Sequence, residues 1–295
     1  MTAAPATAAT ATTATATAPF APAPPSVPAV PAPARPAPVR SVPAAPTGPA
    51  PARYSVLLAA DEDDVRAAQR LRHEVFAGEM GASLSTPVPG LDVDPFDAHC
   101  DHLLVREEAT GEIVGTYRLL SPAGATAAGG LYSETEFDLS RLAGLRPALV
   151  EAGRSCVHPG HRDGAVVGLM WAGILRYLLE RGHTWVAGCC SVPLADGGAT
   201  AAGVWQSVRT RHLSPAEYRV TPHRPWAAAG AAGPEPAART AMPALLRGYL
   251  RLGAWVCGAP AHDPGFGVAD LYVLLSLERT DPRYLRHFMS LGSAR

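Results

Sequence analysis

Lysine is absent from the chain, because all 25 basic residues are arginine. This absence excludes any mechanism that needs a lysine nucleophile or a Schiff base. The 26 acidic residues leave a formal net charge of −1. The chain as a whole therefore has no general electrostatic attraction for nucleic acid, and we expect no nucleic-acid partner.

Cysteine is scarce, and long apolar runs are missing. The five cysteines are odd in number and show no CxxC spacing, which argues against a disulfide framework or a zinc site. The longest apolar run, 165–175, is too short to cross a bilayer. The sequence predicts a cytoplasmic protein without a metal site. Any contact with a membrane is expected to be peripheral, at the surface of the bilayer.

Residues 1–52 consist almost only of Ala, Pro, Thr and Val and hold nearly half of the 30 prolines. Such a segment cannot bury enough apolar surface to offset its ordering entropy, so we expect a disordered tail. It has neither the basic start nor the compact apolar run of a secretory signal. Residues 53–295 suffice for one large α/β domain, within which the Ala/Pro/Gly-rich stretch 227–241 is predicted to be a flexible linker.

Hydrophobic periodicity predicts strands and helices that follow one another along residues 53–295. Strands are expected at 53–59, 102–106, 113–120, 149–157, 184–192 and 270–278. Helices are expected from Asp61 onward and at 164–180, 200–211, 243–252 and 281–289. This order predicts an α/β layered fold, and the long loop 81–100 is predicted to be a binding loop or lid.

Two opposite charges interrupt the apolar strand 149–157. Side chains alternate along a strand, so Glu151 and Arg154 should face opposite sides, where burying one charge alone costs several kcal/mol. A β-bulge at Gly153 would reset the alternation and let both charges line one cleft. It would also free a backbone N–H for a developing oxyanion. The alternative is an exposed salt bridge between the two residues on an edge strand.

The turn HPGHRDG, 158–164, follows that strand and leads into a helix. Free N–H groups and the helix dipole at such a position attract anions, phosphate above all. A glutamate, an arginine, a spare N–H and a phosphate site together indicate acyl transfer from a phosphopantetheine carrier. An ordinary exposed turn is the alternative.

Several motifs carry a resemblance to one family. They are LRHEVFAGEMG (71–81), DVDPFDAHCDHLLV (92–105), GEIVGTYRLL (111–120), LYSETEFDLS (131–140), EAGRSCVHPGHRDG (151–164) and RGYLRLGAWVCGAPAHDPGFGVADLYVLL (247–275). In this order they closely resemble the ornithine–acyl-carrier-protein N-acyltransferases of ornithine-lipid synthesis, a branch of the GNAT superfamily. The resemblance implies a GNAT-like central mixed β-sheet flanked by helices, with a C-terminal helix/strand extension.

The same arrangement is similar to the acyl-homoserine-lactone synthases, whose pattern implies the site residues here. Glu151 and Arg154 are then catalytic, and Glu151 receives a proton from the attacking amine, directly or through water. A structural ion pair between these two is the alternative. Asp94 and Asp97 would hold the cationic ends of a small amino-acid acceptor, unless they only shape a turn-forming loop.

Three further residues are predicted to bind substrate by the same resemblance, namely Arg72, Phe76 and Arg118. The two arginines either organise Asp94 and Asp97 or hold the carboxylate of the acceptor. Internal salt bridging alone is the alternative for both.

The donor site is expected at His158, Arg162 and Gly164, which would bind the phosphate of phosphopantetheine. The segment HRDGAVVG lacks the spacing of the GNAT acetyl-CoA motif, which weakens acetyl-CoA as donor and fits a carrier-bound acyl chain. The expected partner is thus acyl-carrier protein, with its thioester as donor and no other cofactor. Cys156 is expected to be a packed small residue rather than a nucleophile.

The resemblance implies transfer of a 3-hydroxylated fatty acyl group from acyl-carrier protein to the α-amine of ornithine, which gives a lyso-ornithine lipid. An autoinducer synthase that uses S-adenosylmethionine, a GNAT enzyme for another amine, and an acyl-binding protein without activity are the alternatives. The predicted helix 243–252 places leucines on one side and Arg247 and Arg251 on the other. It either covers the core or contacts an anionic membrane.

Overall fold

The computed structural model describes residues 53–227 and 242–291, all within the structural unit Ala50–Arg295. The predicted tail, 1–52, and residues 228–241 of the predicted linker lie outside the described residues. The strands and helices that position the site all come from the described ranges.

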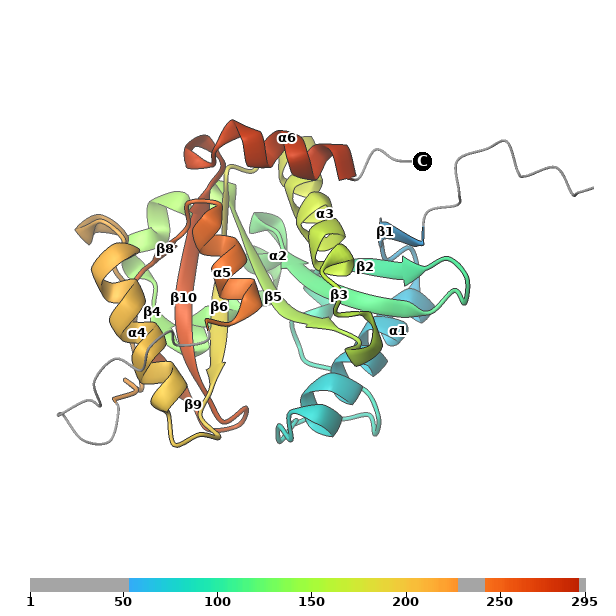
Figure 1. The fold of residues 1–295 in the computed structure, drawn as a ribbon, viewed down its shortest axis with the longest axis horizontal. Helices are drawn as coiled ribbons and strands as arrows, with labels where there is room; N and C mark the ends of the chain where they lie inside the picture. Colours follow the sequence, from blue (N-terminus) through green and yellow to red (C-terminus); the bar gives the residue numbers. More distant parts are fainter. Residues whose placement is uncertain (1–52, 228–241, 292–295) are drawn as a thin grey trace, which may run out of the picture. The chain divides into compact units, whose positions relative to one another are not determined.

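An eight-stranded sheet has the order β1-β2-β3-β5-β6-β10-β8, with β9 paired to β10 (Figure 1). Its strands are β1 (Tyr54–Leu58), β2 (Asp101–Glu107), β3 (Ile113–Leu120), β5 (Leu149–Val157), β6 (Trp185–Pro193), β8 (Trp255–Val256), β9 (Ala261–Asp263) and β10 (Val268–Ser276). Every neighbouring pair is antiparallel except β5 and β6, which are parallel. The predicted central mixed sheet is therefore confirmed.

The parallel pairing of β5 with β6 is short. Only Leu149–Glu151 pair with residues 185–187, and beyond them the two strands separate (Figure 1). Gly188 lies at the last close approach, because a Cβ there would collide with the carbonyl oxygen of Ala152. The strands thus part immediately after Glu151.

Helices cover both faces of the sheet. Helix α3 (Ala165–Arg181) contacts β1, β2 and β3, and α1 (Glu62–His73) contacts β3 and β5. Figure 1 shows α3 in front of these strands and α1 behind them. Helix α6 (Pro282–Leu291) packs on α3, and α4 (Ala199–Arg211) on β6. The fold is the α/β layered one that the order of elements predicts.

The predicted start of α1 is confirmed. The side chain of Asp61 accepts hydrogen bonds from the amides of Asp63 and Asp64, each at 3.0 Å, and the acidic first turn suits the positive end of the helix dipole. The helix continues into a π-helical segment, Glu74–Glu79. This segment carries Phe76 to the smaller cavity described below and Glu79 to Arg162.

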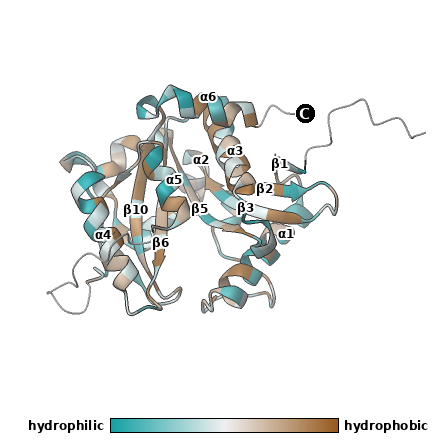
Figure 2. Cartoon of the chain, in the orientation of Figure 1, coloured by the Kyte–Doolittle hydropathy of each residue, from teal (hydrophilic) through white to brown (hydrophobic). Residues whose placement is uncertain are grey.

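Helix α5 (Ala244–Arg251) covers the core. Leu246, Tyr249 and Leu252 are buried, and the Tyr249 ring meets Trp171 of α3 edge-to-face at 4.5 Å. Arg247 and Arg251 lie on the exposed side. Hydrophobic residues run along β6 and β10, and β10 is buried over its whole length (Figure 2). Among the described residues, no helix combines the length and apolarity needed to cross a membrane.

The sequence reading missed several short elements. Helix α2 (Pro122–Ala128) buries no residue, so it shows no hydrophobic periodicity, and only its cap Ser121 and the left-handed Gly129 mark its ends. Strands β4 (Phe137–Asp138) and β7 (Thr221–Pro222) form a separate two-stranded sheet. Like β8 and β9, they are too short to show alternation. The 3-10 turns are Asp97–His99, Tyr132–Thr135, Ser140–Ala148, Pro159–His161, Ala216–Tyr218 and Leu277–Arg279.

Candidate active site

A β-bulge interrupts the pairing of β3 with β5. Thr116 faces Cys156 and Arg118 faces Gly153, so one extra residue is inserted on β5 between these pairs. Within this bulge, Arg154 has a positive φ of +52°. That conformation costs a non-glycine residue about 1–2 kcal/mol. The bulge is therefore beyond Gly153, which keeps its ladder partner. The prediction of a bulge is confirmed, and its predicted position is corrected by one residue.

The bulge turns Glu151 and Arg154 toward the same cavity, which has a volume of about 230 Å³. Phe76 and Arg118 also line it, and the Phe76 ring lies edge-to-face against Phe266 at 5.7 Å. The alternative of an ion pair between Glu151 and Arg154 is wrong, because the described ion pairs of Arg154 are made with aspartates. Both charges therefore face the space between the parted strands.

Glu151 is held by the backbone of the 3-10 turn Tyr132–Thr135. The amide of Tyr132 donates to Oε2 at 2.6 Å and the amide of Ser133 donates to Oε1 at 2.9 Å. Burial raises the pKa of Glu151, against the opposing effects of these hydrogen bonds and of the Arg118 charge. The result is a fixed carboxylate whose affinity for a proton is higher than usual, as a general base requires.

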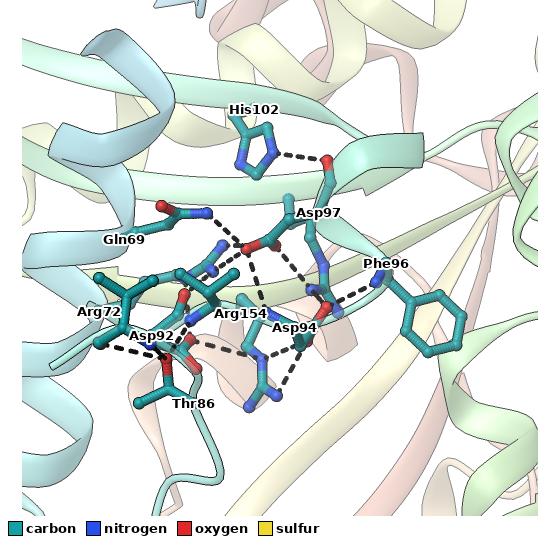
Figure 3. Close-up of polar contacts among 12 residues, drawn as sticks. Gln69, Arg72, Thr86, Asp92, Asp94, Phe96, Asp97, His102 and Arg154 are labelled. Carbon is teal, nitrogen blue, oxygen red and sulfur yellow. Dashed lines mark hydrogen bonds and ion pairs between the residues drawn. The ribbon is translucent and has the colours of Figure 1, made fainter. Parts of the chain in front are cut away.

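Three arginines and three aspartates form what we call the arginine–aspartate network: Arg72, Arg118, Arg154, Asp92, Asp94 and Asp97. Figure 3 shows this network and labels its members other than Arg118. Arg72 contacts Asp97 at 2.7 Å and Asp92 at 2.9 Å between nitrogen and oxygen. Arg118 bridges Asp94 at 2.6 Å and Asp97 at 2.9 Å. The network fastens the loop that carries the acids to α1, β3 and β5.

The network keeps Asp94 and Asp97 ionised. Burial alone would raise the pKa of Asp97, but the hydrogen bonds and charges of Arg72 and Arg118 hold that pKa well below its usual range. The pKa of Asp94 is also lowered, because Arg118 and Arg154 outweigh the effect of its burial. The side chain of Gln69 adds a hydrogen bond to Asp97 at 2.9 Å.

These contacts correct two predicted roles. Asp94 and Asp97 do not line the cavity, and their carboxylates are engaged by arginines of the chain rather than open to an acceptor. Of the roles considered for Arg72 and Arg118, organising these acids is the one that the structure shows. Arg72 is fully buried within the network, whereas Arg118 also reaches the cavity.

A second cavity, of about 1070 Å³, runs along the N-terminal half of α3 and under α5 and α6. Arg162 and Gly164 line it, as expected of a donor site, but His158 does not. His158 instead accepts a hydrogen bond from the amide of Gly160 at 3.2 Å. Arg162 makes two contacts of 2.6 Å with Glu79 in an exposed position. Of the three residues predicted to bind phosphopantetheine, two therefore line this cavity and His158 does not.

The two cavities meet at the bulge. Tyr117, Ser155 and Leu245 line both of them. The larger cavity along α3 therefore adjoins, at the bulge, the smaller cavity that Glu151 lines. The cysteine nearby is inert, because burial raises the pKa of the Cys156 thiol well above its usual value.

Sequence reasoning missed three carboxylates that also line the smaller cavity, Glu136, Asp263 and Asp270, which we call the carboxylate cluster. One oxygen from each lies within 4.8 Å of the others. Asp92 was also missed as a member of the network. No signal in the sequence joins positions 136, 263 and 270, because separate elements bring them together: the turn before β4, the end of β9 and the start of β10.

The chain resembles known proteins in sequence and in fold. The family described as "Acetyltransferase (GNAT) domain" matches residues 71–172. The L-ornithine N(alpha)-acyltransferase of Brucella abortus is 38% identical over 246 residues, covering 79% of this chain and 88% of that protein. The protein of the same name from Rhizobium meliloti is 35% identical over 255 residues, covering 80% and 84%. A solved CoA-dependent acyl-homoserine lactone synthase, BjaI, aligns with a TM-score of 0.49 at 18% identity, covering 82% and 90%.

Proposed function

The chain belongs to the family of L-ornithine N(alpha)-acyltransferases, and we propose that it moves a 3-hydroxylated fatty acyl group from acyl-carrier protein to the α-amine of ornithine. The family relationship confirms the resemblance seen in the sequence motifs. The single observation that carries the mechanism is the meeting of a long cavity and a charged cavity at the bulge beside Glu151.

Glu151 acts as the base in this proposal. An α-amine is largely protonated at neutral pH and cannot attack a thioester until it loses a proton. The carboxylate of Glu151, held by the Tyr132 and Ser133 amides, takes that proton directly or through water. The amine nitrogen then bonds to the acyl carbon while the C–S bond breaks. The second proton that the nitrogen loses goes to the sulfur, directly or through water, so the sulfur leaves as the carrier thiol.

The bulge supplies the group that stabilises the developing oxyanion. Arg154 and Ser155 have no partner on β3, so the ladder leaves backbone N–H groups of this segment without a strand acceptor. An N–H there can stabilise the negative charge that develops on the thioester oxygen. Arg154 lines the same cavity and presents positive charge to the carboxylate of the acceptor. The reaction is a direct attack in a ternary complex, without a covalent enzyme intermediate.

The donor arm occupies the larger cavity. Its phosphate lies near Arg162 and the start of α3, where the helix dipole favours an anion. Arg247 and Arg251, exposed on α5, line the same cavity and present positive charge to an acidic carrier protein. The apolar walls formed by Val167, Met170 and Phe288 suit an acyl chain.

Peripheral contact with an anionic membrane completes the proposal. Helix α6 exposes Tyr284 and Leu291, and α5 exposes two arginines beside it, a combination that suits the surface of an anionic bilayer. Co-sedimentation with vesicles tests it. We expect binding to phosphatidylglycerol vesicles and none to phosphatidylcholine vesicles, and equal binding to both would remove this contact from the proposal.

The function itself is tested by product analysis. Purified full-length chain is incubated with 3-hydroxyacyl carrier and ornithine, and the product is identified by mass spectrometry. We expect acyl-ornithine joined at the α-nitrogen and free carrier thiol. A lactone formed with S-adenosylmethionine would identify an autoinducer synthase instead. Carrier binding without consumption of thioester in the presence of any amine would identify an acyl-binding protein.

A further inference from the structure

The carboxylate cluster combines two features: its three acids line one cavity, and they lack cationic partners. None of the ion pairs formed by the described residues includes Glu136, Asp263 or Asp270. Asp263 accepts hydrogen bonds from the amides of Gly265 and Phe266 at 2.8 and 3.2 Å. Glu136 shares a side-chain hydrogen bond with Asp270 and has a long contact of 3.9 Å from the Cys189 thiol. The acids of the cluster therefore contact one another and backbone amides rather than a paired cation.

Asp270 provides an independent observation that points to a ligand at this place. Its side chain is only 2% exposed, it lines the cavity, and its Oδ1 has no hydrogen-bond partner. A buried acceptor without a donor destabilises the protein, more so when it is charged. A donor that arrives with the substrate would remove this cost.

The raised pKa values of the acids in the cluster agree with the lack of a paired cation. Burial and the charge of Asp270 raise the pKa of Glu136 to about 9, and burial raises the pKa of Asp270 to about 6. Without a bound cation, part of the cluster keeps its protons at neutral pH. A cation placed among the three oxygens would let them ionise and would bind strongly in return.

We propose that the carboxylate cluster binds the side-chain ammonium of the acceptor and thereby selects a diamino acid. This inference rests on the proposed function, in which the α-amine of the same molecule lies at Glu151. An ammonium has three N–H donors and no acceptor, which matches three converging carboxylates.

A short series of contacts connects the two ends of the site. Ser133 donates its amide to Glu151, its hydroxyl contacts the Cys189 thiol at 3.3 Å, and that thiol contacts Glu136 at 3.9 Å. The carboxylate that receives the α-proton and the cluster thus lie on one wall of one cavity. An amino acid with a short aliphatic side chain ending in an amine can span them.

Calorimetric titration of the full-length chain, with unacylated carrier present, tests the inference through binding. The ligands are ornithine and norvaline, which has the same carbon chain without the terminal amine. We expect the wild type to bind ornithine about tenfold to a hundredfold more tightly, as charge-assisted hydrogen bonds predict. Glu136→Gln and Asp270→Asn should reduce this preference to near unity. Glu217→Gln, which changes an exposed acid outside the cavity, should preserve it.

Thermal unfolding shows whether the variants fold, and we expect melting temperatures equal to or above that of the wild type, since each variant removes an uncompensated acid. An unchanged ornithine preference in both variants would overturn the inference, as would equal affinity of the wild type for the two amino acids or binding of neither.

A divalent metal is the competing occupant, because carboxylate oxygens also bind Mg²⁺ and Ca²⁺. Titration with MgCl₂ and CaCl₂ that shows binding in the wild type and none in Asp270→Asn, together with loss of ornithine preference in EDTA, would overturn the ammonium assignment. The proposed function fails separately, if the wild type acylates no amino acid at all while its binding preference persists.

Discussion

Two sets of three carboxylates lie in the same domain and differ in nearly every respect. In the arginine–aspartate network, arginines contact each acid, the pKa values of Asp94 and Asp97 are lowered, and neither of these side chains lines the cavity. In the carboxylate cluster the ion pairs are missing, the pKa values of Glu136 and Asp270 are raised, and all three acids line the cavity. The acids that stabilise the fold are paired with arginines of the chain, whereas the acids of the proposed substrate site have no such ion pair.

Breaking the network should give the largest change in stability. We expect Arg72→Met to lower the free energy of unfolding by about 3–5 kcal/mol, because it leaves buried carboxylates without their partner. Urea denaturation measures this effect. Arg66→Met is the matched control, since Arg66 is 52% exposed and pairs with Glu62 and Asp63 at the surface, worth about 0–1 kcal/mol. Equal effects of the two substitutions would contradict the structural role of the network.

The cluster should respond to pH in the opposite direction from the network. Because the pKa of Glu136 is raised to about 9 in the folded protein, the folded state keeps a proton that the unfolded state releases above pH 5. Stability should therefore fall as pH rises from about 5 to 9, with a slope of up to about 1.4 kcal/mol per pH unit for one proton.

Glu136→Gln should flatten this slope in urea denaturation curves recorded across the range. The charges that raise the pKa of Glu136 come from Asp270, Asp263 and Glu151, whereas His223, Arg224 and His262 line a neighbouring cavity with it. Glu134→Gln is the control, because Arg146 lowers the pKa of Glu134 despite its partial burial. A slope that survives in Glu136→Gln would show that this carboxyl is not protonated in the folded state.

The smallest effect is expected at the donor site. Arg162→Ala should raise the KM for the acyl carrier about tenfold, on the order of one charge-assisted hydrogen bond, while stability changes by less than about 1 kcal/mol. Initial rates at varied carrier concentration measure it. Glu79→Gln breaks the same exposed pair but keeps the arginine, so its KM for the carrier should not rise. A similar rise in both variants would make Arg162 a structural residue only.

The sequence predicts the regular elements well, because their signals are local. The alternation in β5 and the apolar faces of α1 and α3 are visible without any tertiary contact. The conflict between Glu151 and Arg154 is local as well, so a bulge and a shared cavity can be predicted from one strand. The bulge lies one residue beyond its predicted position, because the aspartates that hold Arg154 come from a distant loop.

The partners of the charges could not be predicted from the sequence. The spacing of Asp94 and Asp97 is compatible with acceptor binding, and only the fold shows that Arg72 and Arg118 engage both. The carboxylate cluster has no sequence signal, since the pairing of β9 with β10 places Asp263 opposite Val268, two residues before Asp270. Which acids lack a cation is a property of the assembled domain.

Single-turnover kinetics of Glu151→Gln test the central claim most directly. The wild type should show a rate of acyl transfer that rises with pH as the Glu151 carboxyl, whose pKa is raised by burial, loses its proton. The variant should transfer the acyl group about 10²–10⁴ times more slowly, without that carboxyl-dependent rise, and with an unchanged thermal unfolding curve. An unchanged rate and pH profile in Glu151→Gln, or an acyl group trapped on a cysteine of the chain, would contradict the account.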